Sequence, residues 1–258
     1  MPILKIDFED VAYTLDGPAG APVVMLSNSL GTTMSMWERQ AQFLQRQYRV
    51  LRYDTRGHGQ SAVPAGRYTV QQLGNDVLQL LDALDIEKVN FCGISMAGMI
   101  GMWLGIHAPS RLEKLVIANS AARIGTAEGW HARAQLVLAS GMDDVADGAA
   151  GRWFTPAFIA HAPDQVAQYV QSLRTCSPAG YAGCCQALAD ADLREGIAAI
   201  KTPTLLIVGR HDPVTTAADA HFMQSRIGNS RYAELLASHL SNIEASDAFN
   251  RLLQDFLT

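Results

Sequence analysis

Short apolar runs alternate with amphipathic helical stretches along most of this 258-residue chain. Five runs are β-rich or continuously apolar, as in a sheet buried on both faces; they are residues 23–27, 50–54, 89–93, 115–119 and 204–209. Residues 231–235 predict a last strand, and residues 4–8 and 11–15 predict an opening hairpin with its turn at Glu9-Asp10. Because helical stretches separate the runs, we expect an α/β fold: a mostly parallel sheet of about eight strands, right-handed crossovers and helices on both faces.

The clearest helix signal starts at Thr69, which Gln72 follows in the spacing of a capping box. Apolar residues then recur at helical spacing and predict a stripe that faces the core: Val70, Leu73, Val77, Leu80, Leu81 and Leu84. The stretch therefore predicts one of the helices that separate the strands.

Residues 123–192 break the alternation, because they show helical patterns and no convincing strand. The predicted helices are residues 126–140, 146–153, 163–173 and 178–188. About 70 residues between two core strands are too many for a loop. We therefore expect a helical cap over residues 123–192, packed at the carboxyl edge of the sheet where such folds bind ligands. Residues 1–122 and 193–258 would form the core domain.

Composition and charge argue against several functional classes. The net charge of −5 gives no support for nucleic-acid binding, which favours a basic patch. The N-terminus lacks the apolar core of a signal peptide, and the longest uncharged stretch, residues 91–108, contains several glycines and predicts a buried strand and helix rather than a membrane span. The cysteines show no zinc-site spacing and predict four reduced thiols in a cytoplasmic protein: Cys92, Cys176, Cys184 and Cys185.

The segment 93–97, Gly-Ile-Ser-Met-Ala, carries the strongest chemical signal. It follows a predicted strand and precedes a predicted helix, so Ser95 matches the nucleophile elbow of acyl-transfer enzymes. The turn would place the Met96 N–H at a helix start, where an oxyanion is stabilised. Gly93 and Ala97 approach each other across such a turn, and both are small. A chance Gly-x-Ser in a loop is the alternative.

Two further residues complete a triad in the chain order Ser95, Asp212, His239. Asp212 lies just past the strand 204–209, and His239 lies ahead of the C-terminal helix; this order is that of α/β enzymes with a nucleophile elbow. Asp212 could instead cap a turn, and His239 could be a surface histidine. The rival base is His211, but neighbouring side chains at a strand end point to opposite sides. Of the other histidines, His58 is predicted to lie in a structural turn and His107 to cap a helix.

The three residue types suit one reaction. A serine hydroxyl needs a histidine to remove its proton, the histidine then protonates the leaving oxygen, and the carboxylate fixes its tautomer. The loop 28–31, Asn-Ser-Leu-Gly, would add a second oxyanion donor, the N–H of Leu30. A plain glycine-containing turn is the alternative there.

The chain resembles the α/β-hydrolases along its whole length and, more narrowly, the 3-oxoadipate enol-lactonases of bacterial aromatic catabolism. The segments that carry the resemblance are residues 28–32 with Met36-Trp37, 54–59, 93–96 and 238–242. The family usually has glycine where this chain has Ala97. The resemblance implies an α/β-hydrolase fold that opens a carboxylated enol-lactone to 3-oxoadipate, with no metal and no organic cofactor. It leaves the oligomeric state open.

Other functions on the same fold share the triad and differ only in the pocket. They are a general carboxylesterase, a carbon–carbon bond hydrolase and a cofactor-free perhydrolase. A ligand receptor without activity is a further alternative, which an intact triad disfavours.

A substrate carboxylate requires a cation or a set of donors in the pocket. Residues 123–192 contain four arginines, no lysine and seven acidic residues, so one placed arginine must serve. Arg133 is our candidate, because Trp130, Arg133, Ala134 and Val137 would share one helix face. Arg152 beside Trp153 is the second candidate. The alternative for Arg133 is a solvated arginine whose stem covers the core.

Overall fold

One sheet organises the protein, for which the computed structural model describes residues 2–6 and 9–258. The strand order is β1-β2-β4-β3-β5-β6-β7-β8. Antiparallel pairing is confined to β1 with β2 and β2 with β4, and the other neighbours are parallel. The predicted mostly parallel sheet of about eight strands is therefore confirmed. The strands are β1 Ile3–Ile6, β2 Glu9–Asp16, β3 Val23–Ser27, β4 Arg49–Tyr53, β5 Val89–Ile94, β6 Leu112–Ala118, β7 Thr204–Gly209 and β8 Ser230–Leu235.

The opening hairpin differs from its prediction in one respect. Ile6 pairs with Glu9 and Lys5 pairs with Asp10, so the acidic pair belongs to β2 and the prediction of a turn there was wrong. β2 tolerates the polar Asp10 because an antiparallel strand near the sheet edge can leave one face in water, and Asp10 is exposed. Residues 7–8, part of the predicted first strand, lie outside the described residues.

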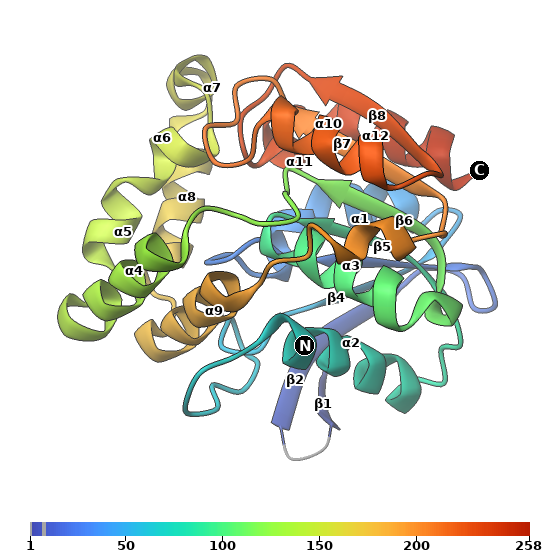
Figure 1. The fold of residues 1–258 in the computed structure, drawn as a ribbon, viewed down its shortest axis with the longest axis horizontal. Coiled ribbons are helices and arrows are strands. Elements are labelled where there is room, and N and C mark those ends of the chain that lie inside the picture. Colours follow the sequence, from blue (N-terminus) through green and yellow to red (C-terminus); the bar gives the residue numbers. More distant parts are fainter. Residues whose placement is uncertain (1, 7–8) are drawn as a thin grey trace.

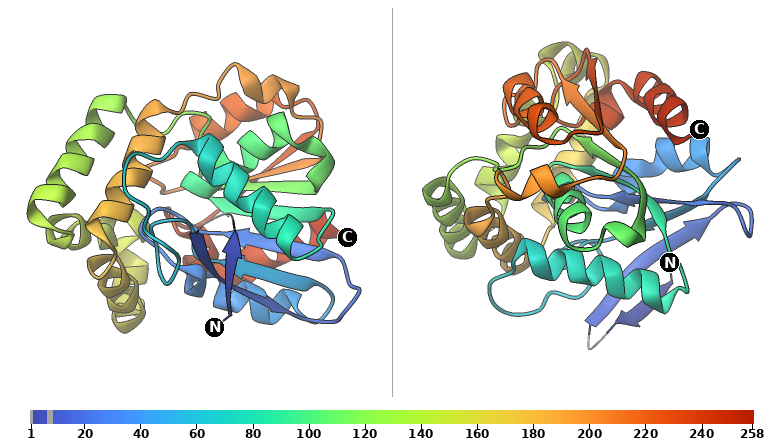
Figure 2. Two further views of the ribbon diagram at one scale, coloured as in Figure 1. Left: turned by 90° about the horizontal axis from the view of Figure 1, so that it is seen from below. Right: turned by 45° about the vertical axis from the view of Figure 1, so that its right-hand side comes forward.

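Helices cover both faces of the sheet (Figure 2). On one face α1 (Glu38–Leu44) packs against α12 (Ser246–Leu257), and on the other α2 (Val70–Ala83) packs against α3 (Met96–His107). α10 (Ala217–Arg226) lies against β7 and β8. The short elements are η1 Met34–Trp37, η2 Pro109–Arg111, η3 Gly196–Ala199 and α11 Ser241–Glu244.

The capping box of α2 forms as predicted. The Gln72 N–H donates to Thr69 Oγ1 at 3.1 Å, and the Thr69 N–H donates to Gln72 Oε1 at 2.9 Å. These bonds satisfy two of the backbone groups that a helix start leaves unpaired. The predicted core stripe is buried except for Leu84, which is half-buried.

Six helices between β6 and β7, here called the cap helices, gather at one side of the sheet (Figure 1). The predicted helix 146–153 is two short helices, α5 and α6, and α7 was not predicted. Short helices give little periodicity, because six residues cover fewer than two turns. The division into core and cap domains remains a prediction. The cap helices are α4 Ala127–Ser140, α5 Asp143–Asp147, α6 Ala149–Trp153, α7 Pro156–His161, α8 Pro163–Arg174 and α9 Pro178–Asp190.

A close backbone contact holds α9 against the loop that follows β4. A Cβ on Gly180 would lie 2.1 Å from the Gly57 carbonyl oxygen, and Gly57 has φ +81°. Only glycine fits at both positions, because a side chain on either would enter the other backbone. The contact therefore joins the cap helices directly to the core.

The stretch 91–108 contains the end of β5 and all of α3, as predicted. α3 is only 12 residues long, and most of it is buried. Within residues 2–6 and 9–258, the structure has no helix long and apolar enough to cross a membrane.

Candidate active site

Ser95 lies between the end of β5 and the start of α3, as the elbow pattern predicts. Its backbone angles are φ 58° and ψ −118°, a conformation that a residue with a side chain rarely adopts. Two contacts hold this strained turn: the Ser95 N–H donates to the Ala118 carbonyl at 3.0 Å, and Ser120 Oγ donates to the Ser95 carbonyl at 2.7 Å. Such strain occurs at functional sites when the surroundings over-determine it.

Gly93 is required by the same turn. A Cβ at this position would lie 2.3 Å from the Ala97 carbonyl oxygen. Ala97 itself is fully buried, so its methyl group fits where the family usually has glycine. The departure at Ala97 therefore leaves the elbow intact.

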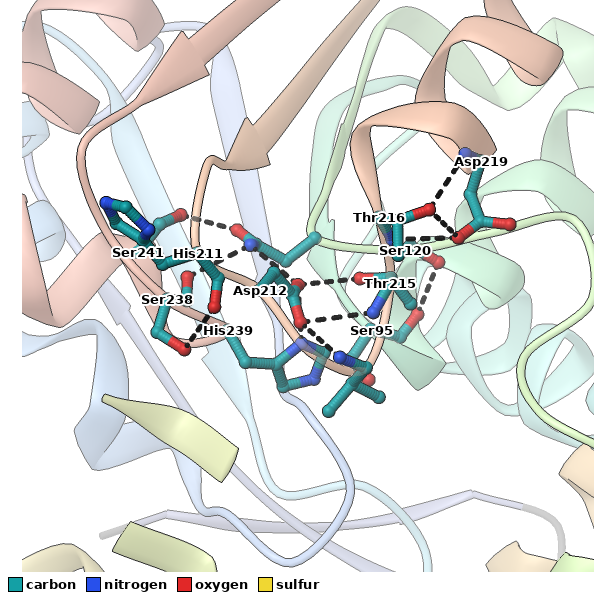
Figure 3. A network of polar contacts seen from close by, with 12 residues as sticks. Ser95, Ser120, His211, Asp212, Thr215, Thr216, Asp219, Ser238, His239 and Ser241 are labelled. Atoms are coloured by element: carbon teal, nitrogen blue, oxygen red, sulfur yellow. Dashed lines mark hydrogen bonds and ion pairs between the residues drawn. The ribbon is translucent and has the colours of Figure 1, made fainter. Parts of the chain in front are cut away.

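Asp212 and His239 form a buried hydrogen-bonded pair (Figure 3). The His239 Nδ1–H donates to Asp212 Oδ2 at 2.8 Å. Asp212 also accepts from Thr215 Oγ1 at 2.7 Å and from the N–H groups of Val214 and Thr215 at 2.7 and 3.1 Å. The carboxylate therefore caps its own turn and binds the histidine, so the two interpretations of Asp212 are compatible.

Electrostatics keeps Asp212 ionised. Burial raises the pKa of Asp212, but the His239 charge and the hydrogen bonds from His239, Asn119 and Thr215 outweigh burial and hold the pKa below its usual value. An ionised Asp212 keeps the proton on Nδ1 of His239 and leaves Nε2 free to accept one. Within the described residues, no hydrogen bond joins Ser95 to His239, a contact that often forms only with substrate bound. The role of the three residues as a triad remains a proposal.

Two backbone N–H groups are available to hold an oxyanion. Leu30 follows β3 in a buried loop, and Met96 is the first residue of α3. In the described chain, neither N–H donates a hydrogen bond within the protein. The Gly31 N–H, by contrast, donates to His58 Nε2 at 2.9 Å and is not available. This leaves the two groups that the sequence predicts as oxyanion donors.

Two adjoining cavities open beside His239. The inner one, of about 40 Å³, is lined by His239, Leu30, Trp153, Tyr181 and six further residues. The outer one measures about 290 Å³ and shares the walls Trp130, Arg133, Arg152 and Val214 with the inner one. The sequence-predicted pocket residues therefore lie together, next to the candidate base.

Two guanidinium groups in these walls lack a carboxylate partner. Arg133 lies over the Trp130 ring at 5.1 Å, and Arg152 donates to the Val145 carbonyl at 2.6 Å. Burial and then the Arg133 charge lower the pKa of Arg152. Among the described residues neither forms an ion pair, whereas the other arginines of this region bind aspartates: Arg123 with Asp192 and Arg174 with Asp143. Two adjacent unpaired cations favour an anionic ligand.

The rival histidines lie elsewhere. His211 is exposed, and in Figure 3 its ring points away from the Asp212 carboxylate. His107 is exposed in the last turn of α3 and contacts Trp103 at 4.9 Å between ring centroids. The C-cap itself is Ala108, so His107 does not occupy the cap position.

A family model described as the alpha/beta hydrolase fold matches residues 22–246 of this chain. The chain belongs to the α/β-hydrolase family. This match confirms the predicted fold class. Three enol-lactonases confirm the narrower resemblance.

The α/β-hydrolase is 48% identical to 3-oxoadipate enol-lactonase 2 of Acinetobacter baylyi. The alignment spans 248 residues and covers 95% of this chain and 93% of that protein. The chain is 47% identical over 247 residues to 3-oxoadipate enol-lactonase 1 of the same organism, with 96% and 92% covered. The crystal structure of the enol-lactonase from Burkholderia xenovorans LB400 superposes with a TM-score of 0.97 at 43% identity, with 99% of each chain covered.

Asn119 is a site residue of this α/β-hydrolase that sequence reasoning missed. Asn119 Nδ2 donates to Asp212 Oδ2 at 3.0 Å and to the Ser238 carbonyl at 3.2 Å, and Ser241 Oγ donates to Asn119 Oδ1 at 2.5 Å. Its φ of 42° is a left-handed conformation that asparagine tolerates better than most residues. The carboxamide therefore joins the Asp212 turn to the His239 loop, a link that no local sequence signal marks.

His58 was predicted to lie in a structural turn, and it also binds a distant loop. Its Nε2 accepts the Gly31 N–H, so Nδ1 carries the proton and faces the Arg56 carbonyl at 3.3 Å and Cys184 Sγ at 4.0 Å. Burial lowers the pKa of His58 to about 4. Neutral His58 therefore holds the loop that carries Leu30.

This arrangement predicts a pH-dependent stability. The pKa of His58 is about 4 in the folded protein, against 6.5 for an ordinary histidine. As pH falls below 6.5 the unfolded chain binds the proton first, so about 3 kcal/mol of stability is lost between pH 6.5 and 4. In urea unfolding across this range, His58→Gln should lose about 3 kcal/mol less than the parent. The exposed-site control His107→Gln should follow the parent, and equal slopes for all three proteins would refute the prediction.

A metal role has no support in the described part of the chain, where no three His, Cys, Asp or Glu side chains could hold an ion. The four cysteines are free thiols, three of them buried. Burial raises the pKa of Cys176 to about 12, so this partly exposed thiol is a poor nucleophile. Ser95 therefore remains the candidate nucleophile.

Proposed function

We propose that this α/β-hydrolase opens 3-oxoadipate enol-lactone to 3-oxoadipate. The observation that carries the proposal is one pocket in which His239, hydrogen-bonded to Asp212, lies beside two guanidinium groups that form no ion pair among the described residues. Ester-cleaving groups next to an anion site suit a lactone with a carboxylate arm. The enol-lactonase relatives, at 47–48% identity over nearly the whole chain, support the same substrate. A cytoplasmic location is part of this proposal.

In the proposed reaction Ser95 Oγ attacks the lactone carbonyl carbon while His239 Nε2 accepts the Ser95 proton. The N–H groups of Leu30 and Met96 bind the oxyanion. As the intermediate collapses, the ring C–O bond breaks and His239 returns the proton to the leaving enol oxygen. The enol becomes a ketone, which disfavours reclosure. Water then loses a proton to His239 and attacks the acyl carbon. As the acyl C–Oγ bond breaks, His239 returns this proton to Ser95 Oγ and the acid is released.

The cap supplies recognition in this proposal. Arg133 would bind the substrate carboxylate, with Trp130 and Trp153 as apolar walls and Arg152 as a second cation. Ala134 and Val137 are fully buried beneath Arg133 on α4, so this helix face points inward. This burial supports a binding role for Arg133 over solvation alone.

A substrate panel tests the function. The panel compares 3-oxoadipate enol-lactone, p-nitrophenyl acetate and butyrate, and a ring-cleavage diketone, each by kcat/KM. We expect the enol-lactone to exceed the simple esters by orders of magnitude and the diketone to be inert. Preference for a neutral ester would identify a general carboxylesterase, and turnover of the diketone a carbon–carbon bond hydrolase.

Arg133→Met should lower kcat/KM for the charged substrate only. Loss of a charge-assisted contact costs about 1.5–3 kcal/mol, so kcat/KM for the enol-lactone should fall roughly ten- to a hundredfold. The value for p-nitrophenyl acetate should remain within about twofold of the parent. Arg123→Met is the matched control, because Arg123 is exposed and paired with Asp192 outside the pocket. Equal losses for the charged and neutral substrates would show that Arg133 only supports the cap.

A further inference from the structure

The carboxylate of Glu244 lies between the cap helices and the loop that carries His239. Glu244 ends α11 and accepts a hydrogen bond from the Ser238 N–H at 2.9 Å. The same carboxylate accepts from the Thr155 N–H, at 3.2 Å to Oε2, and from the Thr155 hydroxyl. Thr155 is the N-cap of α7, where its Oγ1 accepts from the Phe158 N–H at 3.3 Å. One carboxylate thus joins the start of a cap helix to the residue before His239.

A second hydrogen bond joins the same two segments on the other side of His239. The Leu240 N–H donates to the Trp153 carbonyl at 3.0 Å. Trp153 is buried and lines the inner cavity together with His239. The N–H groups before and after the histidine are therefore both held by residues 153–155, one directly and one through Glu244. Figure 1 shows α7 next to the C-terminal segment that carries α11.

The remaining contacts of Ser238 reach the core. Its carbonyl accepts from Asn119, and its hydroxyl donates to the His211 carbonyl at 3.3 Å. Ser238 is only 2% exposed, so its N–H would lose its partner without Glu244, and an unsatisfied buried donor is costly. In the part of the chain that the structure describes, Glu244 forms no ion pair, so its hydrogen bonds to Ser238 and Thr155 are what hold it.

We propose that Glu244 is a positioning residue for His239, and that it makes the placement of His239 depend on the placement of residues 153–155. Hydrogen bonds to a charged acceptor are stronger and shorter than neutral ones, so a carboxylate suits this junction better than an amide. Small displacements of a catalytic group cost large factors in rate. The inference rests on the proposed acyl-transfer chemistry at Ser95, but not on the choice of lactone.

The test is the rate at which diisopropyl fluorophosphate labels Ser95, measured alongside hydrolysis of p-nitrophenyl acetate. In labelling, Ser95 Oγ bonds to phosphorus, the P–F bond breaks, fluoride leaves and the Ser95 proton passes to His239. The reagent carries no carboxylate, so Arg133 and Arg152 have no anion to recognise. Glu244→Gln places an NH₂ group among N–H donors, and it should slow labelling and ester kcat by about tenfold or more while ester KM stays within about twofold.

Thr155→Val removes the hydroxyl link to Glu244 and keeps the bond from Ser238. It should slow labelling by about threefold to tenfold. Thr69→Val is the matched control, because it is the same substitution at the N-cap of α2, away from the histidine loop. This control should lower the melting temperature as Thr155→Val does and label at the parental rate.

The outcomes separate this inference from the proposed function. Labelling of the parent that is lost in Ser95→Ala supports acyl-transfer chemistry. A parent that is not labelled overturns that chemistry and this inference together. If the parent is labelled, parental labelling rates in Glu244→Gln or Thr155→Val overturn the positioning role alone. Slowing of Thr69→Val by the same factor would also overturn it, since general loss of stability would then explain the effect.

Discussion

Replacement of Ser95 by alanine is expected to reduce kcat by roughly 10⁴-fold or more while the protein remains folded. The reason lies in the elbow, because Ser95 is the single residue between the end of β5 and the start of α3 and is the candidate nucleophile. The hydroxyl makes no hydrogen bond within the described residues, so its loss leaves no protein group unpaired. Steady-state kinetics with the enol-lactone, together with the melting temperature, measures both parts of the prediction.

Ser120→Ala is the matched control for this change. Ser120 Oγ donates to the Ser95 carbonyl at 2.7 Å, so the variant loses a hydroxyl that supports the elbow and leaves the nucleophile in place. We expect a loss of tenfold or less. If Ser95→Ala retained activity within tenfold of the parent, the assignment of the nucleophile would be wrong.

Strands buried on both faces were the most predictable part of the fold. β3 and β7 begin and end at the predicted residues, and every residue in both is buried. A strand that is buried on both faces is apolar at every position, so the apolar run begins and ends where the buried strand does. The outer strands carry mixed patterns, which explains the misplaced turn at Glu9-Asp10 and the residue-scale shift at the start of β8.

The cap was predictable as a helical region but not helix by helix. α4 and α8 are 14 and 12 residues long, which is enough periodicity to recognise. α7 has six residues and no buried one, so no apolar stripe marks it. Its signal is local, since Thr155 caps the helix and Pro156 starts it.

The site residues also fall into a predictable and an unpredictable group. Ser95, Asp212 and His239 could be proposed because their local contexts and chain order have a chemical meaning. Asn119 and Glu244 act through contacts across 93 and 89 residues, to Asp212 and Thr155, and no local pattern encodes such a partner. His58 was placed in a turn, but its bond to Gly31 is likewise visible only in the folded protein. Partners that are distant in the sequence are thus harder to predict than the candidate catalytic groups themselves.

His239→Ala is expected to be nearly as damaging as Ser95→Ala, roughly 10⁴-fold in kcat, whereas His211→Ala should stay within about threefold of the parent. His239 is buried against the ionised Asp212, and its Nε2 is free to accept the serine proton. His211 is exposed and points away from that carboxylate, although it precedes Asp212 in the chain (Figure 3). The two variants should be assayed side by side on the same substrate. A greater loss for His211→Ala would transfer the base to His211 and refute the triad.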